Sequence, residues 1–480
     1  MRCALLVWLG LVTAAAAQTG DDPLGARLQQ LEAETRALRQ EVETLRAQPG
    51  PVALAPAAPA TAPQAAPGVA PLPAVADPPP KPADEGYYTM DEIKTEMKKL
   101  VWTKGDFKIV PYGILWGSSV YETGRSNPGD YTLYVLPRRV DDNQEFHVDG
   151  RSTRLGVDIS GPPVPFFNCA AAGGKVEVDF QRNIDTENRS GVLLRHAYVE
   201  VKDDDSRLLL GQTWDVISPL YPGMLMYSIG WGGGNIGYRR AQLRGERYYN
   251  FSDTFRMTIQ GSANADIITD TGTNLTTEQA GWPVLMGRIG TTIGPRGQGC
   301  KPIEIGVSSH IGETIYDIRP PFLTPVTGLN RRTWSINADV RVPIGERFGV
   351  QGEAFTGENL GSYFGGVLQG IDLGSPANPV LGVVGVPGSL EPIGSSGGWV
   401  DIWYDWTCRL HSHFGYGIDD PFDQDITVGR TQNSFFFTNI SFDLTEKFLI
   451  GFEYSQWRTL WKGSNDGDSS HFDLVAKYFF

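Results

Sequence analysis

The last ten residues of the chain, 471–480, read HFDLVAKYFF and predict the fold. Successive side chains of a β-strand point to opposite faces, so this segment has two different faces. One face is apolar and consists of Phe472, Leu474, Ala476, Tyr478 and Phe480. The other face carries Asp473, Val475 and Lys477. Such a strand lies with one face in an apolar environment and the other against polar groups or water.

The same alternation recurs from residue 105 to the C-terminus, interrupted by clusters of Gly, Pro, Asn and Asp. It predicts about sixteen strands, with approximate cores at 106–121, 146–160, 174–183, 190–202, 206–217, 236–248, 253–264, 283–293, 302–312, 331–342, 347–358, 398–408, 411–418, 431–443, 447–458 and 469–480. Tight turns such as 203–205, 343–346 and 444–446 alternate with longer connections at about 122–145, 218–235, 265–282, 313–330 and 359–397. Short turns on one side and long loops on the other are typical of a membrane barrel.

A soluble β-sandwich is the alternative fold, in which the apolar faces would form a dry core. We favour an all-β, transmembrane antiparallel β-barrel because the strands form one unbroken series that ends at Phe480. Trp and Tyr side chains near strand ends, such as Trp399 and Trp457, are also typical of membrane interfaces. No window beyond the N-terminus has the run of roughly 18 apolar residues that a transmembrane helix needs.

Four segments precede the barrel, which we place at 105–480. Residues 1–17 have the charged, apolar and small-residue order of a secretory signal peptide. Residues 18–47 carry a heptad seam of Leu24, Leu28, Leu31, Thr35, Leu38, Val42 and Leu45, which predicts a self-associating coiled coil without fixing its stoichiometry. Residues 48–86 form a Pro- and Ala-rich linker, and a capping box at Thr89 and Glu92 predicts a short helix within 87–104.

The net charge and the residue types argue against nucleic-acid binding and against catalysis. The net charge of −14 makes nucleic acid an unexpected partner. No set of side chains on one face suggests catalysis, so the protein is not expected to be an enzyme, and we predict no cofactor and no metal site. Cys3 leaves with the signal peptide, and the pairing of Cys169, Cys300 and Cys408 cannot be read from the sequence.

Inward-facing arginines are the candidate site of the channel. Arg240, Gln242 and Arg244 share one face of a strand, and Arg154, Arg256 and Arg288 lie on the inward faces of other strands. These side chains either form a basic ladder that passes anions or pair with Asp158, Glu246 and other acids of the lumen, and the sequence does not decide between the two.

The connection 218–235 is the candidate constriction of the lumen. It is long, rich in glycine and aromatic residues, and contains Tyr221, Tyr227 and Trp231. Either it folds inward and narrows the channel, or it is an ordinary surface loop.

Several motifs resemble a known family. Arg195-His196-Ala197-Tyr198-Val199, Leu209-Leu210-Gly211-Gln212-Thr213-Trp214 and Arg239-Arg240-Ala241-Gln242 follow one another in the order found in the DcaP-like trimeric outer-membrane porins, and Arg154-Leu155-Gly156 is similar to a further pattern of that family. The resemblance implies a homotrimer, a periplasmic coiled coil and a preference for small anionic solutes, with Arg240 and Arg244 facing the pore. The long linker, the three cysteines of the barrel and the 359–397 loop depart from the pattern.

Two functions follow as hypotheses. The first is a porin of the outer membrane, a water-filled channel for passive diffusion of small hydrophilic and anionic solutes. The second is a structural anchor, in which the coiled coil and linker tether the membrane to peptidoglycan. The expected partners are outer-membrane lipid, further copies of the chain, and either the solutes or the cell wall.

Overall fold

The computed structural model describes residues 102–138, 143–165, 170–182, 191–267, 275–296, 301–318, 325–375 and 385–480. The predicted signal peptide, coiled coil and linker lie outside these residues, as does most of the predicted helix 87–104. Trp102–Lys104, at the end of the segment predicted to hold this helix, is strand β1 and pairs with the start of β2 (Phe107–Glu122). Gly105, at φ +61°, turns the chain there so that Trp102 lies opposite Ile109.

Within the described residues, sixteen antiparallel staves form a closed barrel. Two staves are interrupted, one between β5 (Glu145–Asp149) and β6 (Arg154–Val164) and one between β12 (Leu275–Gln279) and β13 (Val284–Ile293). The other staves after β2 are β7 (Ala170–Arg182), β8 (Gly191–Lys202), β9 (Ser206–Trp214), β10 (Arg239–Ser252), β11 (Phe255–Asn264), β14 (Ile303–Ile318), β15 (Val326–Ile344), β16 (Phe348–Glu358), β19 (Gly394–Asp405), β20 (Leu410–Pro421), β21 (Gly429–Thr445), β22 (Phe448–Lys462) and β23 (Gly467–Phe479). The predicted strand number and the barrel are confirmed, and the sandwich alternative is wrong.

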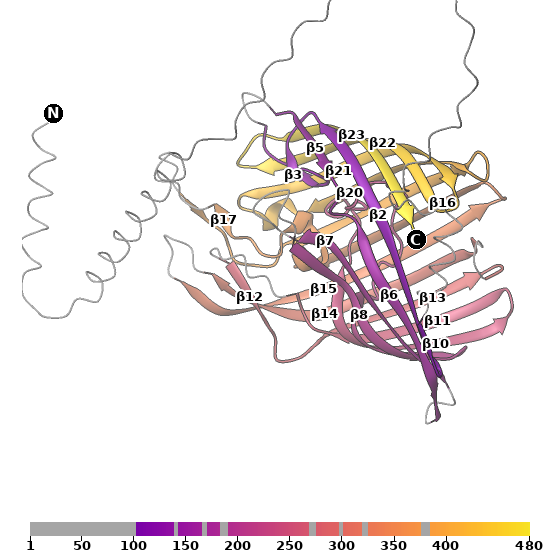
Figure 1. Cartoon of the computed structure of the whole chain (residues 1–480). Helices are drawn as coiled ribbons and strands as arrows, with labels where there is room; N and C mark the ends of the chain where they lie inside the picture. The colour runs from indigo at the N-terminus through magenta and orange to yellow at the C-terminus, as the bar shows by residue number, and fades with distance from the viewer. Residues whose placement is uncertain are drawn as a thin grey trace, which may run out of the picture. The chain divides into compact units, whose positions relative to one another are not determined.

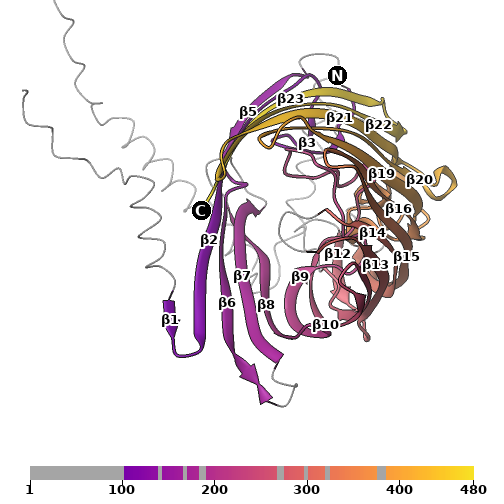
Figure 2. The same ribbon diagram turned by 90° about the vertical axis from the view of Figure 1, so that its right-hand side faces the viewer.

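The barrel closes between its first and last staves, β2 and β23, which lie side by side in Figures 1 and 2. Their register places Tyr121 opposite Phe472. The C-terminal residue completes the seam, because the Gly113 N–H donates to the Phe480 carbonyl at 3.2 Å and the Phe480 N–H donates to the Gly113 carbonyl at 3.1 Å. No sheet edge remains at this seam for another chain to extend.

The connections at the two ends of the barrel differ in length. We call one end the turn end, because the staves are joined there by short connections such as 203–205, 345–347 and 446–447. Cys408 is exposed in the turn between β19 and β20 at this end, whereas Cys169 and Cys300 lie outside the described residues. The opposite end, with the longer connections, is the loop end.

The two faces of the wall have opposite character. On β14, Ile305 and Val307 are exposed on the outside, whereas Ser308 and His310 are buried on the inside. A water-soluble protein buries its apolar side chains, so this inverted distribution is that of a barrel surrounded by lipid. No helix of the described part of the chain is long and apolar enough to cross a bilayer.

Three connections from the loop end fold into the barrel and bury apolar side chains there. Loop 1 (123–138) contains the hairpin of β3 (Ser126–Pro128) and β4 (Thr132–Val135), which lies inside the arc of β21, β22 and β23 in Figure 2. Loop 3 (215–238) joins β9 to β10. Loop 6 (359–393) contains the short helices η2 (Gly361–Tyr363) and η3 (Gly366–Leu368) and the small strands β17 (Gly374–Ser375) and β18 (Val386–Pro387). A further short helix of the described residues, η4 (Asp423–Asp425), joins β20 to β21.

Candidate channel lumen

Loop 3 crosses the interior and is fixed to the opposite wall. Its backbone N–H groups donate to carboxylates of three staves: Leu220 to Glu353 Oε1 at 2.7 Å, Gly223 to Asp401 Oδ2 at 3.0 Å and Leu225 to Glu453 Oε2 at 2.7 Å. Hydrogen bonds to charged acceptors are stronger than those between neutral groups. The surface-loop alternative is therefore wrong, because the backbone of this segment is held inside the barrel.

The three aromatic residues predicted to form the constriction differ in exposure. Tyr221 is 55% exposed, whereas Tyr227 and Trp231 are 6% and 4% exposed. Trp231 stacks on Phe364 of loop 6 with ring centres 4.8 Å apart, and Tyr227 packs on Tyr131 of loop 1 at 5.1 Å. Tyr227 and Trp231 therefore join the three loops to one another, and Tyr221 presents an open aromatic face.

Arg240 lies buried under loop 6, and its side chain is 0% exposed. It pairs with Asp215 Oδ2 at 3.3 Å and with Asp266 Oδ1 at 3.2 Å, and one guanidinium N–H donates to the Ser362 carbonyl. A charge without water around it is stable only when such partners surround it. In this structure Arg240 fastens loop 6 to the wall and is not part of an open basic surface.

Gln242 and Arg244 follow Arg240 on the same inward face. Gln242 donates to the carbonyls of Thr213 and Trp214, and Arg244 pairs with Glu246 at 3.3 Å and donates to the carbonyl of Trp214. Arg244 and Tyr221 both line a cavity of about 240 Å³ next to loop 3. Among the predicted residues, Arg244 is both paired with an acid and part of the lining of this cavity.

Arg256 and Arg288 also have partners. Arg288 donates to both carboxylate oxygens of Asp339, at 3.0 and 2.6 Å. Arg256 donates to Asn250 Oδ1 at 2.9 Å and lies over the ring of Tyr248. Arg240, Arg244 and Arg288 therefore match the alternative in which the inward-facing arginines pair with acids of the lumen. Other cations of the lumen have no ion pair with an acid among the described residues.

Arg154, the remaining predicted residue, has no carboxylate within 4.0 Å among the described residues. Its guanidinium lies over Trp116 at 5.4 Å and over Tyr227 at 6.0 Å. The ammonium of Lys477 lies over the ring of Trp116 at 3.6 Å, and it too has no described acid within that limit. Aromatic faces attract cations without cancelling their charge.

Arg239 is a third cation of this kind. It lies over Trp214 at 4.8 Å and Tyr238 at 4.5 Å, within the aromatic cluster of the infolded loops. Two of its nitrogens have no hydrogen-bond partner. Sequence reasoning missed Lys477 and Arg239 as site residues, although Lys477 stands on the charged face of the terminal strand and Arg239 precedes Arg240.

Loop 6 is held at its outer part by Asp372. Burial raises the pKa of this carboxyl, but hydrogen bonds outweigh burial and leave the pKa below its ordinary value. The donors are the Thr427 hydroxyl at 2.6 Å and the backbone N–H groups of Ser389 at 2.8 Å and Thr427 at 3.1 Å. Asp372 therefore connects loop 6 to the β20–β21 connection as a carboxylate.

Comparisons with known proteins agree with this geometry at the level of the fold. No protein-family model and no curated protein matches the sequence. Among solved structures, the outer membrane channel DcaP of Acinetobacter baumannii is 18% identical, with a TM-score of 0.59 over 79% of this chain and 99% of that chain. An anion-selective porin from Comamonas acidovorans, 11% identical, has a TM-score of 0.48 over 78% of this chain and 100% of that one. OmpF of Salmonella typhi, also 11% identical, has a TM-score of 0.49 over 78% of this chain and 98% of that one. The resemblance to DcaP noted in the sequence is thus confirmed for the fold, and the chain has the fold of the DcaP outer membrane channel.

Proposed function

We propose that this protein is an outer-membrane porin that lets small hydrophilic solutes diffuse through its lumen and prefers anions. The exposed apolar outer face supports a membrane location, and a barrel of sixteen staves is wide enough to enclose water as well as its infolded loops. The DcaP fold supports the same reading.

The unpaired cations carry the anion preference. Arg154 and Lys477 both lie over the ring of Trp116 and have no carboxylate within 4.0 Å among the described residues, whereas Arg240, Arg244 and Arg288 are paired with Asp or Glu. The field inside a narrow, water-filled passage depends on the charges that remain uncompensated near it. A negative net charge of the chain is compatible with this preference because it counts charges far from the passage.

The test is the ion selectivity of the refolded protein in a planar bilayer under a salt gradient. We expect a reversal potential of the sign that anion selectivity gives, and a shift toward zero in Arg154→Gln and Lys477→Gln. The control is Arg409→Gln, which removes one charge from the exposed β19–β20 turn and leaves the reversal potential unchanged. Cation selectivity of the unaltered channel, or equal shifts in all three variants, would contradict the proposal.

A homotrimer with a periplasmic coil is the second part of the proposal, and it rests on the heptad seam of 18–47 and on the linker 48–86. The same segments support a second, structural role, in which they bind peptidoglycan and anchor the membrane to the cell wall. Deleting 18–47 is expected to convert trimers to monomers in analytical ultracentrifugation. Deleting 18–86 separates the two functions: loss of envelope attachment with unchanged conductance supports an anchor beside the channel, and no envelope defect removes the anchor.

A further inference from the structure

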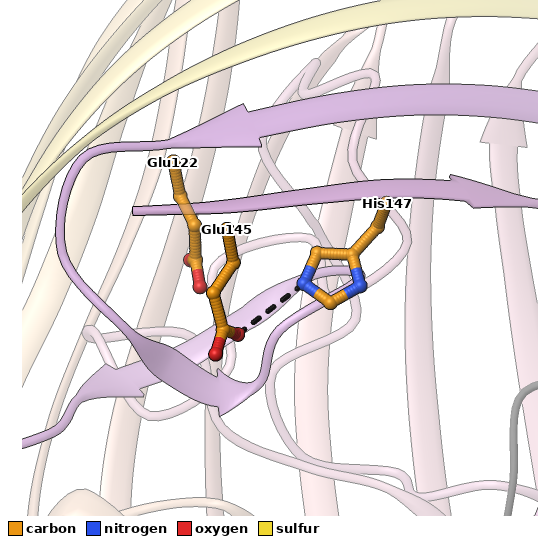
Figure 3. Close-up of side chains that lie close together, drawn as sticks. All are labelled: Glu122, Glu145 and His147. Carbon is orange, nitrogen blue, oxygen red and sulfur yellow. Dashed lines mark ion pairs between the residues drawn. The ribbon is translucent and has the colours of Figure 1, made fainter. Parts of the chain in front are cut away.

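Two carboxylates and an imidazole meet on the inner wall at the loop end of the barrel. Glu122 is the last residue of β2, and Glu145 and His147 lie on β5, which pairs with it. One ligand atom from each side chain lies within 4.8 Å of the other two, and Figure 3 shows the three side chains converging below the paired strands. Among the described residues this is the one group of three such side chains.

Glu122 is buried, and one of its two carboxylate oxygens accepts no hydrogen bond. Its side chain is 0% exposed, and Oε1 accepts a hydrogen bond from the Ser126 N–H at 3.1 Å. Oε2 accepts no hydrogen bond, although Nε2 of His471 lies 3.2 Å away and the ring of His471 lies against the Thr132 hydroxyl. A buried carboxylate oxygen without a donor is costly and points to a bound group that completes it.

Glu145 is only partly buried, with a side chain that is 24% exposed. Its Oε1 pairs with Arg125 Nε at 2.5 Å, and its Oε2 lies 3.4 Å from His147 Nε2. That separation is longer than a charge-assisted hydrogen bond. It agrees with the spacing of roughly 3.3 Å between two ligand atoms that each lie about 2.0–2.1 Å from a tetrahedral zinc ion.

Gly129 keeps the space beside these atoms open. This glycine has φ +115°, and a Cβ there would lie 3.0 Å from His147 Nε2 and 3.5 Å from Glu145 Oε2. The nitrogen and the oxygen therefore both lie beside Gly129 of loop 1, which places no side chain against them.

We propose that Glu122, Glu145 and His147 bind a divalent transition-metal ion such as Zn²⁺. Imidazole together with carboxylate is a ligand set for zinc, whereas Ca²⁺ and Mg²⁺ take oxygen ligands throughout. Arg125 and Ser126 of loop 1 orient the two carboxylates by occupying their other oxygens. The ion would fasten loop 1 to β2 and β5 at the entrance of the lumen.

Tag-free, full-length protein in detergent micelles tests the site by isothermal titration calorimetry with Zn²⁺, after treatment with EDTA. We expect one Zn²⁺ per chain, with an affinity at least about tenfold lower in His147→Asn and in Glu145→Gln. The matched control is His411→Asn, because His411 is also an inward histidine paired with an acid, Asp405 at 2.7 Å, but lies at the turn end.

Co²⁺ provides a second readout, since its visible absorption reports ligand number and type. An imidazole-dependent tetrahedral spectrum that is lost in His147→Asn supports the site. Circular dichroism and heat-modified electrophoretic mobility establish that each variant is folded, and Glu145→Gln serves if His147→Asn does not fold. Absence of stoichiometric binding by the unaltered protein, or equal affinity in the folded variants, would overturn the proposal.

Discussion

The guanidinium of Arg240 lies 3.8 Å from the ring centre of Tyr363, so a wall residue of β10 is stacked on a residue of loop 6. Both side chains are buried, and Asp215 and Asp266 flank the arginine. This contact joins β10 to a segment more than a hundred residues away in the sequence. It makes loop 6 part of the interior of the barrel.

Replacing Arg240 is expected to destabilise the barrel. Arg240→Met leaves Asp215 and Asp266 buried without a cation, and removal of one partner from a buried ion pair costs about 3–5 kcal/mol. The measurement is the free energy of unfolding in guanidinium of protein refolded into lipid. Arg256→Met is the control, since Arg256 is partly exposed and bonded to an uncharged Asn250; a loss as large as that of Arg240→Met would contradict the assignment.

Tyr221 and Trp231 are expected to have different effects on the channel. Tyr221→Ala removes an exposed ring next to the cavity and should raise single-channel conductance without changing stability. Trp231→Ala removes a buried ring that joins loops 3 and 6, at a cost of about 3–5 kcal/mol, and should make the current noisy. Single-channel recordings and thermal unfolding distinguish the two. Identical effects would show that loop 3 does not have one packed and one open side.

Acid should release loop 6 from its contact with the β20–β21 connection. The pKa of Asp372 is lower in the folded protein than in the unfolded chain, where it is about 3.9. The stabilisation is therefore present above that value and is lost as the pH falls through the lower pKa of the folded state.

Hydrogen exchange at pH 6 and pH 3, corrected for intrinsic rates, measures this effect on peptides that contain Ser389 and Thr427. Protection should fall at pH 3 in the unaltered protein. In Asp372→Asn it should be low at both pH values. Protection that falls equally with pH in both proteins would assign the acid sensitivity to another group.

The outer face of β14 is expected to tolerate no charge. Val307 is 57% exposed there, and arginine near the middle of the membrane costs about 2–4 kcal/mol. Val307→Arg should lower the unfolding free energy in lipid vesicles by this amount, whereas Val307→Leu should leave it nearly unchanged. A loss of less than about 0.5 kcal/mol in Val307→Arg would place this face away from lipid.

The wall of the barrel was predictable in detail because its signal is local. The predicted strand 347–358 corresponds to Phe348–Glu358, and the predicted 469–480 corresponds to Gly467–Phe479. The strands predicted at 302–312 and 331–342 were too short, since β14 and β15 reach Ile318 and begin at Val326. Their extensions beyond the apolar band lack clear alternation and resemble loop sequence.

The sequence by itself determined that alternating strands separate an apolar outside from a polar inside, because side-chain direction in a strand depends only on position along it. The tertiary structure decided which inward-facing cations are left without an acid partner in the described part of the chain. Whether Arg240 meets Asp215 and Ser362, or Arg154 meets Tyr227, depends on the path of loops 3 and 6. Loop 6 brings Ser362 to Arg240, 122 positions away, and no periodicity in the sequence encodes such a contact.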